Sequence, residues 1–214
     1  NGIHSEMTVY VDTELPVKFT VIKLKNNSGR FRRITVTGYV DWVLGDLKSK
    51  SAMHIVTELD PDSGALFARN PYNTEFPDRV AFFDVDSVSK TVTGDRAEFI
   101  GRNGSARNPA AMWRTKLSGK LGVGVDPCAA IQVMVDLPDG REKEVTFKLG
   151  QGKNQYEAST IVRQFRGGEV VHEALQKVKN YWEHTTGAVQ IETPDASINL
   201  LANGWLTYQT LACR

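Results

Sequence analysis

The 214 residues include 26 Lys and Arg against 25 Asp and Glu, with 41% apolar and 9% aromatic residues. This composition is typical of one large or two modest globular domains, and it excludes an intrinsically disordered chain. The formal net charge of +1, with interspersed signs, lacks the basic surplus of a nucleic-acid binder. We therefore expect no nucleic-acid partner.

No secretion or membrane signal is visible in the sequence. His4 and Glu6 stand where a signal peptide would need apolar residues. The longest uncharged run, 196–213, is broken by polar residues, whereas a membrane span needs about 20 mostly apolar ones. The two cysteines, Cys128 and Cys213, lie far apart, and we expect both to be buried free thiols.

Residues 7 to about 150 alternate apolar and polar side chains with the period of β-strands. The turn residues at 26–29 and 138–140 predict two hairpins, one within 17–42 and one within 129–149. Further strands are predicted at 54–59, 65–69, 79–84 and 90–93. Many strands joined by short turns indicate a mainly β fold of antiparallel sheets stacked face to face.

After residue 152 the apolar period becomes helical, and it predicts helices over 155–164 and 169–183, the second ending at Gly187. Thr193 as a capping hydroxyl, Pro194 at the first helical position and Asp195 against the helix dipole predict a last helix that runs to the final residue. Apolar side chains surround much of its axis and demand burial on several sides. We therefore expect this chain to be a piece of a longer polypeptide.

Motif searches assign no catalytic residue and no metal ligand. The sequence has no G-x-S-x-G motif, and its four histidines form no triad or H-E-x-x-H pattern. Two Asp pairs, at 60/62 and 84/86, could supply the paired carboxylates of a glycosidase. Both pairs stand beside turns or strand ends, where Asp usually bonds the backbone, so structural roles are expected.

Residues 93–104 form a charged, glycine-rich stretch that we interpret as a long insertion between strands. Such loops often dock on another surface. Arg96 and Arg102 could contact a sugar there, and they could equally pair with Asp or Glu.

Motifs spread over most of the chain, from about residue 8 to 214, resemble a known family. They are Ala68–Pro71, Thr93–Arg96, Phe99–Asn103, Ser118–Gly119, Gly124–Ala130, Leu149–Gln151, Thr193–Asp195 and Asn203–Gln209. Together they resemble the inverting glycoside phosphorylases of glycosyltransferase family 36, now glycoside hydrolase family 94, which includes cellobiose and chitobiose phosphorylases. The likeness is strongest to the phosphorylase-like C-terminal part of cyclic β-1,2-glucan synthases.

The resemblance implies a galactose-mutarotase-like β-supersandwich over 1–152, a helical linker over 153–192 and the start of a truncated (α/α)6 barrel over 193–214. In the family the barrel carries the chemistry: one carboxylic acid protonates the glycosidic oxygen while inorganic phosphate attacks the anomeric carbon. These barrel residues have no counterpart in the sequence, so none is carried over and the piece alone is expected to be inactive. It would need no cofactor, and its parent would use inorganic phosphate or a sugar 1-phosphate.

The resemblance also suggests residues for contact with carbohydrate or with a neighbouring domain. In the sandwich they are Arg69, Asn70, Asp95, Arg96, Arg102 and Asn103, and in the first barrel helix they are Trp205, Tyr208 and Gln209. Core packing is the expected role of Trp205. Expected partners are a β-linked glucan or oligosaccharide bound through the parent, the barrel itself and a second copy in a homodimer. The resemblance implies a cytoplasmic location.

Two other functions stay open at this point. An independent carbohydrate-binding module would need exposed aromatic rings that stack on sugars, and Trp42, Tyr72 and Trp113 are the available residues. Sandwich core or strand edge is the competing role for each of them. A pure dimerisation module is the other alternative.

Overall fold

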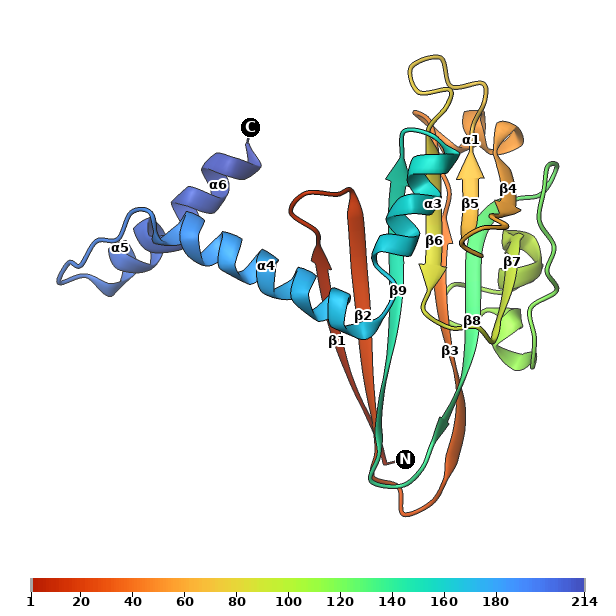
Figure 1. Ribbon diagram of the computed structural model, residues 1–214, viewed down its shortest axis with the longest axis horizontal. Coiled ribbons are helices and arrows are strands. Elements are labelled where there is room, and N and C mark those ends of the chain that lie inside the picture. Colours follow the sequence, from red (N-terminus) through yellow and green to blue (C-terminus); the bar gives the residue numbers. More distant parts are fainter. Residues whose placement is uncertain (1, 214) are drawn as a thin grey trace.

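The structure is a computed structural model that describes residues 2–213. Within this part of the chain, two antiparallel sheets stack face to face (Figure 1). The six-stranded sheet has the order β1-β2-β9-β6-β5-β4, and the three-stranded sheet has the order β3-β8-β7. The strands are β1 (Ile3–Val11), β2 (Val17–Asn26), β3 (Arg32–Asp41), β4 (Val56–Leu59), β5 (Leu66–Arg69), β6 (Val80–Val85), β7 (Lys90–Asp95), β8 (Pro127–Leu137) and β9 (Glu142–Gly152). The mainly β fold predicted from the alternating pattern is confirmed.

Apolar side chains from both sheets meet in the first core. The rings of Phe83 and Phe147 stack there at 5.6 Å between centroids, beside the fully buried Ile131 of β8. Gly38 of β3 faces these rings, and a Cβ atom on it would lie 2.6 Å from each of them. The close approach of the sheets at this point therefore requires glycine.

Helices cover the outer face of the six-stranded sheet and form a second core with it. They are α3 (Gln155–Gln164) and the first half of α4 (Gly168–Gly187), which confirms both predicted helices and the end at Gly187. Asn154 caps α3 by accepting the Glu157 amide at 2.9 Å. Tyr10 of β1 donates its hydroxyl to the Val171 carbonyl of α4 at 2.6 Å, which fixes α4 to the sheet.

Short helices cover the outer face of the three-stranded sheet. They are α2 (Arg96–Ile100) and the 3-10 helix η2 (Ala110–Trp113), and they bury Phe99 and Ile100 of α2 in a third small core. The predicted insertion between strands exists, since residues 96–126 lie between β7 and β8, but residues 93–95 belong to β7 and the insertion begins with α2 rather than with a loop. A further short pair, α1 (Lys48–Ser51) and η1 (Ala52–His54), joins β3 to β4.

Both predicted hairpins are wrong, although their strands exist. β2 pairs with β1 and β9, whereas β3 pairs with β8, so each predicted hairpin links two different sheets. Asn26 explains the crossing: its buried side chain donates to the carbonyls of Arg30 and Leu137, both at 2.8 Å. Its backbone amide also donates to the Arg141 carbonyl at 3.0 Å, so the two turns bond each other at one end of the sandwich.

The C-terminal helices lie away from the sheets at the far end of α4 (Figure 1). They are α5 (Ala196–Leu200), the π-helical turn η3 (Leu201–Trp205) and α6 (Leu206–Ala212). Asp195 rather than Thr193 caps this helix, since Asp195 accepts the Ser197 amide at 2.8 Å and the Thr193 hydroxyl donates to Asn199 Oδ1 at 2.8 Å. Cys128 is buried as predicted, but Cys213 is exposed, because no described element packs over the end of α6.

Candidate functional site

Asn70, at the end of β5, joins two surface loops that form a groove. Its buried side chain donates Nδ2 to the Leu44 carbonyl at 2.8 Å and accepts the Tyr72 amide on Oδ1 at 3.1 Å. The first bond reaches the loop between β3 and α1, and the second stays in the loop between β5 and β6. One buried amide therefore holds both loops in place, and this positioning is the role of Asn70 in the structure.

The groove between the two loops has a volume of 620 Å³. Tyr72 stands in its wall with 73% of its surface exposed, and its ring stacks on His54 of the opposite loop at 4.4 Å between centroids. Asp46, Lys50 and Glu75 line the same groove. An exposed aromatic face is therefore surrounded by charged side chains, an arrangement that suits a polar ligand with one apolar face.

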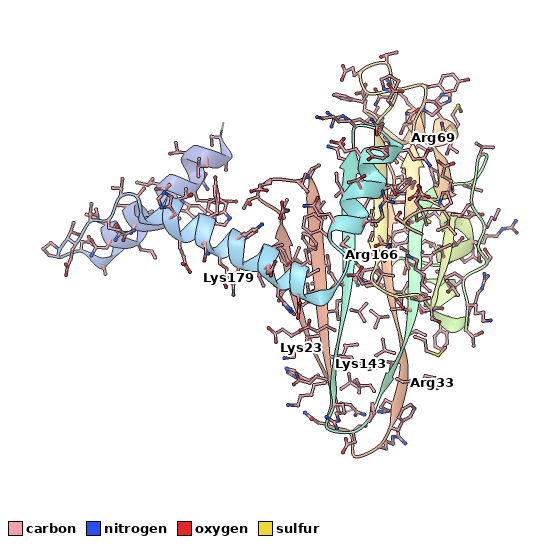
Figure 2. All side chains as sticks on the ribbon, viewed as in Figure 1. Lys23, Arg33, Arg69, Lys143, Arg166 and Lys179 are labelled. Carbon is pink, nitrogen blue, oxygen red and sulfur yellow. The ribbon has the colours of Figure 1, made fainter. Side chains whose placement is uncertain are left out.

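Arg69 lies beside this region but does not line the groove. It is half-buried at the end of β5, near the α1 end of the sandwich (Figure 2). Its Nε stands 3.7 Å from Glu58 Oε1 on the neighbouring β4. This is a cross-strand ion pair, which supports the sheet.

Asp95 is 5% exposed and caps α2, accepting the Ala97 amide at 3.0 Å. It also forms an ion pair with Lys120. Burial would raise the pKa of the Asp95 carboxyl, but the hydrogen bonds from Lys120 and from the α2 amides together hold that pKa below its ordinary value. Asp95 is therefore a charged structural cap.

Arg96 takes part in an ion cluster where β3, β7 and β8 meet. Its Nη1 lies 3.3 Å from Asp126 Oδ2, and its Nε lies 3.6 Å from Asp41 Oδ2. Lys48 binds the same Asp41 at 2.9 Å, and the Tyr39 hydroxyl donates to it at 3.0 Å. The sequence left two roles open for Arg96, pairing with Asp or contact with a sugar. The structure contains the pairing with Asp.

The remaining sandwich candidates, Arg102 and Asn103, lie in an exposed turn after α2. The structure thus separates the six sandwich candidates into three pairs. Arg69 and Asn70 lie at the end of β5, Asp95 and Arg96 lie at the start of α2, and Arg102 and Asn103 lie in the turn after α2.

The three helical candidates lie on the C-terminal helices. Trp205 and Tyr208 are 55% and 47% exposed, with ring centroids 6.0 Å apart, and Gln209 is half-buried. Trp182 of α4 lies 6.0 Å from the Tyr208 ring, and the three aromatic residues line an apolar groove of 960 Å³. Within the described residues α4 covers only one side of this helix and leaves Trp205 exposed, so its expected core packing stays a prediction for the parent protein.

The three aromatic candidates for sugar stacking differ in exposure. Trp42 is 3% exposed in the first core, which removes it as a stacking residue. Trp113 is 81% exposed, and its Nε1 donates to Asn108 Oδ1 at 3.2 Å. Of the three, only Tyr72 lines one of the described hollows.

Sequence reasoning missed a buried ion network under the junction of α3 and α4. Lys148 of β9 is fully buried, lies 3.3 Å from Asp84 Oδ2, pairs with Asp86 and donates to the Phe165 carbonyl at 3.0 Å. Arg166, labelled in Figure 2, reaches the same Asp84 oxygen at 3.3 Å. The alternating pattern places Lys148 on the face of the sheet opposite Phe147. The sequence alone predicts that this face is exposed to solvent, whereas in the structure α3 and α4 cover it.

The described residues contain no group of three or more His, Cys, Asp or Glu side chains suited to hold a metal ion. Over the same residues, no helix has the length and apolar character to cross a bilayer. Of the two Asp pairs, Asp84 and Asp86 belong to the ion network, and Asp60 accepts the Ser63 amide and hydroxyl at 2.9 and 2.6 Å, while Asp62 is exposed in the turn.

Two stacked antiparallel sheets that lead through α3 into a long helix define this chain as a β-supersandwich domain. Residues 1–168 match the family described as glycosyl hydrolase 94, supersandwich domain. The chain belongs to this family.

Similar proteins are carbohydrate-active and much longer. The cyclic beta-(1,2)-glucan synthase NdvB of Rhizobium meliloti (strain 1021) is 36% identical over 205 residues, 95% of this chain and 7% of the synthase. The N,N'-diacetylchitobiose phosphorylase of Vibrio proteolyticus is 23% identical over 221 residues, all of this chain and 27% of the phosphorylase. A solved structure described as a putative kojibiose phosphorylase from human microbiome aligns with a TM-score of 0.46 and 12% identity, over 86% of this chain and 22% of that one. The chain thus spans 7% to 27% of the length of these two curated relatives.

Proposed function

We propose that this chain is the non-catalytic supersandwich and linker portion of a glycoside phosphorylase or cyclic β-1,2-glucan synthase. Its role is to support an (α/α)6 barrel that acts on β-linked glucan or oligosaccharide with inorganic phosphate or a sugar 1-phosphate. The higher identity to the glucan synthase, 36% against 23% for the chitobiose phosphorylase, favours the synthase as parent.

One observation carries the proposal: the buried carboxylates of the described residues already have structural partners. Inverting phosphorolysis needs a carboxylic acid that reaches the glycosidic oxygen with a proton to give. Asp60, Asp84 and Asp95 are the buried acids, and each is held by amides, hydroxyls or cations. A group occupied in this way is not poised as a general acid.

The supporting role has a surface suited to it. The apolar groove of Trp182, Trp205 and Tyr208 lies at the far end of α4, away from the sandwich cores. Aromatic side chains of this kind bury large apolar areas when a second layer of helices packs on them.

The test is an activity assay on the purified chain. Incubated with glucose 1-phosphate and a β-glucan acceptor, it should release no phosphate above a blank without protein. Turnover that follows the protein through every purification step would show a catalytic centre in this chain and defeat the proposal.

A further inference from the structure

Besides the hollow at Tyr72, the same two loops enclose a second hollow that continues it. The second hollow, of 180 Å³, is lined at its far end by Arg79 and Gln151. Both hollows share Asn73 and Phe76 in their walls. Together they form one open groove, long enough to take a ligand that extends along it.

Two aromatic side chains lie along this groove with exposed surface. Tyr72 is 73% exposed and rests on His54, and Phe76 is 47% exposed with the Arg79 guanidinium 4.6 Å from its ring centroid. Each ring is thus supported by a neighbour while part of its surface stays open. Exposed aromatic rings held in place are what a pyranose ring requires, since its C–H face packs on them.

Polar groups surround the rings and keep hydrogen-bonding atoms that the fold does not use. Asp46, Lys50 and Glu75 are exposed in the groove wall. Asn73 uses its Oδ1 for the Glu75 and Phe76 amides at 3.0 and 3.1 Å, which leaves its Nδ2 for a ligand. The two carboxylates are balanced by Lys50 and the Arg79 guanidinium, so the groove has no net formal charge and suits a neutral ligand. The carboxylates accept hydrogen bonds from sugar hydroxyls, and the Asn73 amide donates to them.

The groove is also held in shape before any ligand arrives. The buried Asn70 amide joins Leu44 to Tyr72, and Ser51 donates its hydroxyl to the Val43 carbonyl at 2.8 Å. A site with fixed walls loses less entropy when it binds.

From these contacts we propose that the groove between the loops 43–54 and 70–79 is a binding site for a neutral gluco-oligosaccharide. Tyr72 and Phe76 are its stacking platforms, and Asp46, Glu75 and Asn73 bond the hydroxyls. The identity of the ligand as a glucan rests on the proposed function, whereas the site itself rests on the groove. It would hold a chain of the substrate on the sandwich, outside any centre where bonds are broken.

Calorimetric titration of the 214-residue chain tests the site. The probes are β-1,2-linked glucotetraose, cellotetraose and maltotetraose, in buffer without phosphate. We expect saturable binding of at least one probe. Tyr72→Ala should weaken that binding by about tenfold, the equivalent of one lost stacking contact, and Phe76→Ala should do the same.

Tyr156→Ala is the matched control. Tyr156 is also a tyrosine, 78% exposed, but it starts α3 and lines neither hollow. Its loss should leave the affinity unchanged, and far-ultraviolet circular dichroism should match for all variants. Failure of all three probes to bind, or equal affinity in wild type and Tyr72→Ala, would overturn the proposal. Phosphate release by the chain would defeat the proposed function and leave this binding result standing, because the titration measures no turnover.

Discussion

Lys148 is a cation with no exposed side-chain surface, and its ion-pair partners decide how much it contributes to the free energy of unfolding. Removing one member of a buried ion network leaves the opposite charge in a low dielectric, which costs more than the network itself gains. Asp84 keeps Lys90 at 2.8 Å and Arg166 at 3.3 Å, so part of its charge stays compensated. The cost of losing Lys148 should therefore fall at the low end for a buried pair.

We expect Lys148→Met to lower the free energy of unfolding by about 3 kcal/mol, measured by urea denaturation at pH 7. The matched control is Lys23→Met, which removes an exposed cation from its pair with Glu142 and should cause no measurable change. A Lys148→Met variant as stable as wild type would show that the network contributes nothing.

Asp95 makes the free energy of unfolding depend on pH in the acidic range. Its folded pKa lies below the ordinary value of 3.8, so the folded state binds the proton less readily than the unfolded chain. The stability from Asp95 is fully present above that ordinary pKa and is lost as the pH falls through the lower folded pKa. Asp95→Asn should therefore reduce the unfolding free energy at pH 7 and lose less than wild type between pH 5 and pH 2.5. Parallel pH curves for the two proteins would contradict this.

At the scale of elements, the period of two located the strands but not their partners. β4, β5, β6 and β7 fall within about two residues of their predicted ranges. The alternation says which face each side chain takes, and both a hairpin and a crossing between sheets satisfy it equally. The pairing of β3 with β8 rather than with β2 distinguishes the two, and the buried Asn26 side chain supports it by bonding Leu137 far along the chain.

Asn26→Ala should destabilise the protein by about 2 kcal/mol, because it leaves the buried Leu137 carbonyl without its donor. Asn27→Ala provides the control: Asn27 is exposed, and its recorded bond uses the backbone amide, which alanine keeps. Urea denaturation of both variants measures the difference. Equal loss in both would mean that the two turns do not depend on this side chain.

The candidate site shows a similar division between what the sequence predicts and what it leaves open. A short, unremarkable stretch, 70–76, contains both the buried Asn70 and the exposed Tyr72. Residue type alone does not separate these roles, because exposure depends on where the loop 43–54 lies in space. The charged stretch at 93–104 has the residue types of a docking loop, yet its Asp95 caps a helix and its Arg96 belongs to an ion cluster.

For the whole molecule, the cores divide the chain into parts of different local stability. β9 pairs on both sides and lies between the first two cores, whereas α4 beyond Val178 leaves the sheets and contacts the C-terminal helices alone. Amides exchange with solvent through local opening, and opening is easiest where little apolar surface must separate. The second half of α4, around Lys179 in Figure 2, should therefore open independently of the sandwich.

Hydrogen–deuterium exchange followed by mass spectrometry of peptides measures this directly. Peptides from 179–213 should exchange at least about tenfold faster than peptides from β9, and Val171, which is 1% exposed in the second core, should mark the slow half of α4. Tyr10→Phe removes the hydroxyl bonded to the Val171 carbonyl, so it should speed exchange around 168–174 and leave β8 unchanged. Uniform exchange along the whole of α4, in wild type and in this variant, would mean that the helix and the sandwich unfold as one unit.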